Sequence, residues 1–168
     1  MDQIKIQGGN RLHGEVQVSG AKNAALPVLV SGILADGKTT FDRVPDLMDI
    51  RTLNKILTNL GASVDFDRKA NRVVMDATRL NHFEAPYELV KTMRASVVVL
   101  GPLVSRFGRA KVSLPGGCAI GARPINFHLT ALEKLGAKIT LEEGYVIAEA
   151  KRLIGNRVAF EYPSVGAT

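Results

Sequence analysis

Leu60-Gly61-Ala62-Ser63-Val64 recurs 75 positions later as Leu135-Gly136-Ala137-Lys138-Ile139, and this repetition decides the fold. In both copies an amphipathic segment ends at leucine, glycine follows as a helix stop, and an alternating segment typical of a strand begins. Gly37 and Gly108 end the preceding helix of each copy and lie 71 positions apart. Elements that recur in the same order at such a spacing indicate two structural repeats.

The first repeat is expected to follow two N-terminal strands at 3–7 and 15–18, whose residues alternate between apolar and polar. Ser19 is the predicted N-cap of the next helix, and Gly20 permits a close approach of the backbone. The expected elements of this repeat are a helix over 22–35, a strand over 39–43, a helix over 46–60 and a hairpin of strands over 63–67 and 72–76.

The second repeat is expected to have the same order. Its first helix starts at Pro86 and bends at Pro102, because proline removes a backbone hydrogen bond. A third copy begins with a strand over 157–161 and reaches residues 164–168, which resemble residues 19–22, so we expect an incomplete polypeptide. The expected elements of the second repeat are a helix over 87–107, a strand over 110–114, a helix over 124–135 and a hairpin of strands over 137–141 and 145–148.

The connection that follows the first strand is longer by four residues in the second repeat, and this insertion falls in residues 114–124. It holds Cys118, the single cysteine of the chain, among several glycines. Arg123 follows, and Pro124 suits the first turn of a helix. A thiol, a glycine loop, a cation and a helix N-terminus favour an anion site with a nucleophile or proton donor. The alternative is a glycine-rich turn with an inert cysteine.

Polar and cationic residues recur at the expected helix starts of all three copies. Alignment of the first helices places Lys22 opposite Arg94, while Ser164 and Gly166 occupy the third copy. Packing about a pseudo-threefold axis would bring these helix N-termini together, where their dipoles favour phosphate. Asn23 is a candidate to hydrogen-bond a ligand hydroxyl. The alternatives for these residues are a solvated helix start, a surface cation and a local cap.

Composition narrows the class of protein. A hydrophobic share of 46% and a charged share of 23% over 168 residues are typical of a globular domain. One cysteine excludes an internal disulfide and fits a reducing compartment, and three separated histidines give no metal-ligand spacing. The sequence shows no signal-peptide pattern and no apolar run that could span a bilayer. We therefore expect a cytoplasmic protein without a metal, a cofactor or a membrane partner.

The net charge of +6 raises the question of nucleic-acid binding. The lysines and arginines are dispersed, and aromatic residues make up 5% of the chain. Dispersed cations in apolar and glycine-rich settings suit a small polyanion better than a long phosphate backbone. We therefore expect no nucleic-acid partner.

Four segments in this order resemble the UDP-N-acetylglucosamine enolpyruvyl transferases of the EPSP synthase-like superfamily. They are 19–27 (Ser-Gly-Ala-Lys-Asn-Ala-Ala-Leu-Pro), 91–96 (Lys-Thr-Met-Arg-Ala-Ser), 114–124 (Leu-Pro-Gly-Gly-Cys-Ala-Ile-Gly-Ala-Arg-Pro) and 164–168 (Ser-Val-Gly-Ala-Thr). The resemblance implies an α/β (α+β) fold of βαβαββ units in an inside-out α/β barrel, truncated within the third unit. It implies that strands in residues 1–21 pack on the other domain, that residues 22–168 form an incomplete domain, and that the second domain is absent.

The resemblance implies transfer of the enolpyruvyl group of phosphoenolpyruvate to the 3-hydroxyl of UDP-N-acetylglucosamine, with release of phosphate. This reaction is the first committed step of peptidoglycan synthesis and serves cell-wall biogenesis, cell shape, the cell cycle and cell division. The expected partners are both substrates and the missing C-terminal portion. Because that portion closes over the substrates in the family, we expect this chain alone to be inactive. The alternatives are a non-catalytic UDP-sugar-binding remnant and a relative of the shikimate-pathway enolpyruvyl transferase, against which the cysteine loop argues.

The resemblance also implies roles for individual residues. Cys118 and Lys22 are the implied catalytic residues, with Cys118 as the general acid toward the phosphoenolpyruvate methylene and the site of fosfomycin alkylation. Asn126 stands where the family often has aspartate, and Tyr162 and Pro163 also depart from the family pattern. The residues implied to bind phosphoenolpyruvate are Lys22, Asn23 and Arg123. The residues implied to bind UDP-N-acetylglucosamine are Asn23, Arg94, Arg123, Pro124, Ile125, Asn126, Phe127, Ser164, Val165 and Gly166.

Overall fold

The computed structural model describes residues 3–91, 93–114 and 125–164, and describes Arg94 by its backbone. The first repeat contains a three-stranded antiparallel sheet of order β1-β3-β2. The helices α1 and α2 of this repeat pack against each other. Its elements are α1 (Lys22–Ser31), the short 3₁₀ helix η1 (Gly32–Leu34), β1 (Lys38–Phe41), α2 (Met48–Asn59), β2 (Ser63–Asp67) and β3 (Arg72–Asp76).

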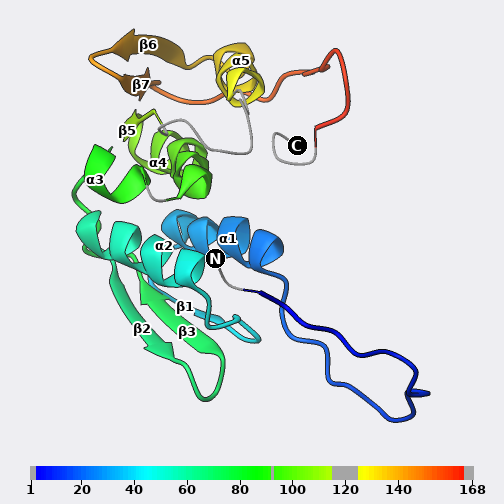
Figure 1. Ribbon diagram of the computed structural model, residues 1–168. Coiled ribbons are helices and arrows are strands. Elements are labelled where there is room, and N and C mark those ends of the chain that lie inside the picture. Colours follow the sequence, from blue (N-terminus) through cyan, green and yellow to red (C-terminus); the bar gives the residue numbers. More distant parts are fainter. Residues whose placement is uncertain (1–2, 92, 115–124, 165–168) are drawn as a thin grey trace.

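The second repeat has a four-stranded sheet of order β4-β5-β7-β6, in which the added strand β4 runs parallel to β5. In Figure 1 the two sheets lie at opposite ends of the molecule, with α1, α2 and α4 between them. The elements of this repeat are β4 (Glu84–Ala85), α3 (Tyr87–Val90), the 3₁₀ helix η2 (Arg94–Val99), α4 (Leu100–Phe107), β5 (Arg109–Ser113), α5 (Asn126–Lys134), β6 (Lys138–Glu142) and β7 (Tyr145–Glu149).

The strand register confirms the two repeats predicted from the sequence. In each sheet the last strand of the repeat lies between two neighbours and pairs antiparallel with both: β3 lies between β1 and β2, and β7 lies between β5 and β6. The residue that ends this central strand faces the start of both neighbours. The matching sets are Asp76 with Lys38 and Ser63 in the first sheet, and Glu149 with Arg109 and Lys138 in the second.

The glycines of the repeated motif hold the same backbone conformation. Gly61 has φ +102° and Gly136 has φ +100°, a region that side chains disfavour. Gly108 ends α4 in the left-handed conformation with φ +74°, as expected for a helix stop. Both predicted hairpins are also confirmed, with β2 and β3 at the predicted bounds.

One hydrophobic core runs through both repeats. It includes Ile33, Leu53 and Leu103, each with an exposed fraction of 0%. Beside it Arg106 of α4 links the repeats: its Nη1 donates to the carbonyls of Ile33 and Ala35, each at 2.8 Å, and to that of Ala77 at 3.3 Å. Its Nη2 bonds Asp36 at 3.1 Å. The guanidinium therefore satisfies carbonyls at the end of η1 that no helical N–H reaches.

The expected strands at 3–7, 15–18 and 157–161 are wrong. Residues 3–21 and 157–161 contain no strand. Ile4 and Ile6 are 89% and 85% exposed, so the apolar face of this N-terminal segment is not covered by the described residues. Alternation of side chains gives a strand only where a neighbouring strand satisfies its backbone groups. The short strand β4 shows the contrast, because β5 lies beside it.

Two details of the helices also differ from expectation. The segment predicted as one helix over 87–107 is divided: α3 ends at Val90, and the helical residues that follow begin with η2 at Arg94. Pro102 is the third residue of α4, just after the 3₁₀ helix η2 gives way to the α-helix. Ser19 is not the N-cap of α1: Ala21 is, without a side-chain hydrogen bond.

Candidate functional site

The N-terminus of α1 presents two of the predicted site residues. Lys22 is the first residue of α1, and its ammonium Nζ lies 2.6 Å from Asp49 Oδ2, in the first turn of α2. Asn23 follows and is exposed. Gly20 comes immediately before, and a methyl group there would lie 1.9 Å from the carbonyl oxygen of Arg43. Backbone contact therefore fixes where the chain enters α1, in agreement with the predicted close approach at Gly20.

The charged residues at the start of α2 are engaged in ion pairs. Arg51 donates from Nε and Nη2 to the two carboxylate oxygens of Asp46, both at 2.7 Å. This bidentate contact holds the pKa of Asp46 below its usual value and raises the pKa of Arg51. Asp49 pairs with Lys22.

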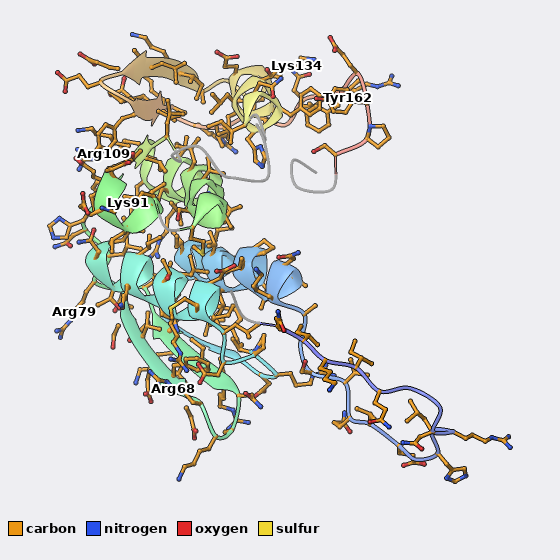
Figure 2. The ribbon with its side chains drawn as sticks, viewed as in Figure 1. Arg68, Arg79, Lys91, Arg109, Lys134 and Tyr162 are labelled. Carbon is orange, nitrogen blue, oxygen red and sulfur yellow. The ribbon has the colours of Figure 1, made fainter. Side chains whose placement is uncertain are left out.

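The start of α5 carries the second group of predicted residues. Ile125 is the N-cap and is partly buried, and Asn126 is exposed at the first helical position. Phe127 stacks on Phe160 with ring centroids 4.8 Å apart, and meets the Tyr162 ring at 4.6 Å in a tilted contact. Figure 2 shows Tyr162 on the C-terminal segment that passes beside α5.

Some predicted site residues lie outside the described part of the chain. Cys118, Arg123 and Pro124 of the insertion do so, as does the side chain of Arg94. The backbone of Arg94 begins η2, which packs against α1. Ser164 is described and partly buried, whereas Val165 and Gly166 are not described.

Sequence reasoning missed two features of this region. The Lys22–Asp49 pair had a weak signal, a carboxylate in the first turn of an amphipathic helix, but nothing indicated which cation it meets. The cluster of Phe127, Phe160 and Tyr162 joins residues too far apart in sequence for periodicity to connect. Together, the described residues offer a half-buried ammonium at one helix start and an aromatic cluster with an exposed amide at another. Such groups bind an anion and a planar ring, respectively.

Five of the described cations are spread over both repeats (Figure 2). The five labelled in Figure 2, Arg68, Arg79, Lys91, Arg109 and Lys134, lie apart along the chain and across both repeats. Among the described residues, no helix is long and apolar enough to cross a membrane, and no three His, Cys, Asp or Glu side chains group as metal ligands.

Comparison with known proteins places the chain in a family. The model of the family described as EPSP synthase (3-phosphoshikimate 1-carboxyvinyltransferase) matches residues 6–168. The chain belongs to the EPSP synthase family. Among its relatives, UDP-N-acetylglucosamine 1-carboxyvinyltransferase of Geobacter metallireducens is 58% identical and that of Thermodesulfovibrio yellowstonii is 54% identical, each over 168 residues. This agrees with the family resemblance stated from the sequence.

Solved structures of enolpyruvyl transferases share the fold of this EPSP synthase family member. The enolpyruvyl transferase NikO from Streptomyces tendae superposes with a TM-score of 0.72 at 28% identity, covering 88% of this chain and 32% of that one. EPSP synthase from Acinetobacter baumannii gives a TM-score of 0.70 at 16% identity, over 92% of this chain and 36% of that one. Both curated relatives named above are covered over 40% of their length by the whole of this chain.

Proposed function

We propose that this chain is part of an enzyme that transfers the enolpyruvyl group of phosphoenolpyruvate to the 3-hydroxyl of UDP-N-acetylglucosamine and releases phosphate. The observation that carries the proposal is identity of 54–58% over the entire chain to seven proteins named UDP-N-acetylglucosamine 1-carboxyvinyltransferase. The structural likeness to EPSP synthase, at 16% identity, supports the fold alone.

The proposed roles follow the chemistry of the residues. Cys118 is the general acid that protonates the methylene carbon of phosphoenolpyruvate, and Arg123 holds a phosphate beside it. Lys22 supplies positive charge where negative charge collects on the substrate, which lowers the barrier electrostatically. The half-buried ammonium of Lys22 and the exposed amide of Asn23 at the start of α1 support these assignments.

The acceptor sugar nucleotide is assigned to the remaining predicted residues. Asn126 and Phe127 lie at the start of α5, and Phe127 contacts the aromatic rings of Phe160 and Tyr162, a setting that suits a planar base. Arg94 and the segment 164–166 would bind the diphosphate. Residues 1–21 would pack on a second domain, which would account for the 89% exposure of Ile4. We place the enzyme in the cytoplasm, in peptidoglycan synthesis, and hence in cell-wall growth, cell shape, the cell cycle and division.

Phosphate release tests the proposal directly. The full open reading frame that contains residues 1–168 is expected to release phosphate when given phosphoenolpyruvate and UDP-N-acetylglucosamine, and fosfomycin should abolish the release. Turnover with shikimate 3-phosphate in place of the UDP-sugar would contradict the choice of acceptor. We expect residues 1–168 alone to give little or no turnover, because they match only 40% of the length of these relatives.

A further inference from the structure

Asp49 lies against the ammonium of Lys22, and the roles proposed above give it no part. Its Oδ2 is 2.6 Å from Lys22 Nζ. The two residues start different helices, α2 and α1, which pack against each other. The contact therefore joins two elements of the fold instead of two turns of one helix, and it fixes the ammonium relative to both helix starts.

Asp49 pairs with Lys22 and not with Arg51, which lies two residues further along α2. Arg51, the nearest cation along α2, already donates two hydrogen bonds to Asp46. Asp49 also sits in the first turn of α2, where the helix dipole favours a charged carboxylate. The side chains of Lys22 and Asp49 are 41% and 32% exposed, so a ligand in solution can reach the pair.

We propose that Asp49 is a positioning residue for Lys22 in the transfer reaction, an inference that rests on the function proposed above. An ammonium has three N–H donors. When one points at Asp49, the other two point in fixed directions toward an anionic substrate. Without a partner, the four-carbon side chain of Lys22 samples several rotamers, and each productive encounter must restrict them again. The pair therefore holds the cation ready for the reacting phosphoenolpyruvate.

The carboxylate has an opposing effect on binding. Asp49 carries a negative charge beside the ammonium that receives an anionic substrate, so it repels that substrate while it orients Lys22. Removal of the charge should therefore strengthen binding of phosphoenolpyruvate and slow its conversion. A role in stability alone would not change these two quantities in opposite directions.

Steady-state kinetics of the full open reading frame that contains residues 1–168 test this. In Asp49→Asn we expect KM for phosphoenolpyruvate to fall about threefold and kcat to fall about tenfold. Asp49→Glu keeps the charge but lengthens the side chain, so kcat should fall without the decrease in KM. Asp46→Asn is the matched control, because it removes a nearby carboxylate that pairs with Arg51 rather than with Lys22. This variant should not lower KM for phosphoenolpyruvate while it lowers kcat.

A second measurement does not need activity. In nitrogen-15 spectra of the lysine ammonium groups, hydrogen exchange at Lys22 Nζ should be slower in the wild type than in Asp49→Asn. Equal exchange, or kcat and KM that both stay unchanged or both worsen, would overturn the inference. A wild-type protein that holds the Lys22 ammonium but shows no transfer to UDP-N-acetylglucosamine would instead overturn the proposed function.

Discussion

The two repeats differ in the length of the connection between the first strand and the second helix. In the first repeat six residues join β1 to α2, and the backbone N–H of Val44 donates to the carbonyl of Asn71 at 2.8 Å. In the second repeat residues 114–125 join β5 to α5 and include Cys118. The strand registers and the glycines after the second helices nevertheless correspond.

This difference indicates that the elements shared by the two repeats maintain the fold, whereas the longer connection carries the proposed chemistry. Sheet register depends on strand pairing and helix stops, so extra residues in a connection change it little. The thiol proposed as the acid lies in the extra residues, whereas the shared elements form the core. We therefore expect substitutions in the insertion to affect catalysis and substitutions at matched positions to affect stability.

The largest effect is expected at the inserted thiol. Cys118→Ala in the full open reading frame should lower kcat about a thousandfold, because loss of a general acid typically costs 10² to 10⁴. The unfolding midpoint should stay within about 2 °C of the wild type. Phosphate release and thermal unfolding check the two quantities. Near-normal turnover of the alanine variant would contradict the separation of chemistry from fold.

The next effect is expected where the repeats are joined. Arg106→Met keeps the length of the side chain but leaves the carbonyls of Ile33, Ala35 and Ala77 without these donors. We expect the free energy of unfolding to fall by about 2–3 kcal/mol, as for hydrogen bonds from a charged group. Chemical denaturation measures it. Arg109→Met is the control, because Arg109 is an exposed residue at the start of β5, and it should cost less than about 1 kcal/mol. Equal losses would argue against the link that Arg106 makes between the two repeats.

A smaller effect should distinguish the matched glycines. Gly61→Ala and Gly136→Ala both place a side chain at φ near +100°, which costs about 1 kcal/mol. At Gly61 the added methyl group would also lie 2.9 Å from the carbonyl oxygen of Arg79, whereas at Gly136 the nearest atom is 3.9 Å away. Gly61→Ala should therefore destabilise the chain more in denaturant titrations. The reverse order would contradict the assignment of the added cost to the close contact with Arg79.

Local patterns predicted most of the repeat. The leucine–glycine–alanine motif and the alternation after it placed β2, β3 and both hairpins, because a helix stop and a two-residue period are properties of neighbouring residues. The strands expected near Ile4 and at 157–161 failed for the opposite reason. A strand needs a partner, and sequence alternation carries no information about whether one lies beside it.

For the candidate site too, local motifs predicted some features and tertiary contacts determined the others. The motifs identified Lys22 and Asn23 at a helix start, where the structure places them. Their ion-pair and ring partners were not predictable, because Lys22 meets Asp49 across two helices and Phe127 meets Phe160 across the second hairpin. Such contacts depend on tertiary packing. The predicted roles of the residues in 115–124 stay predictions, since those residues lie outside the described part of the chain.

The smallest effect is expected from pH, at the connection of the first repeat. Arg51 lowers the pKa of Asp46 in the folded chain, so this pair stabilises the fold above the ordinary carboxyl value of 3.8. The contribution is lost as the pH falls through the lower folded value. On acidification from pH 6 to 3, the hydrogen-exchange protection of the Val44 amide should fall more than that of Leu114, whose amide bonds the carbonyl of Gly144 at the start of the other connection. In Asp46→Asn this difference should disappear, because the amide does not titrate, and a difference that persists would assign the acid sensitivity to another group.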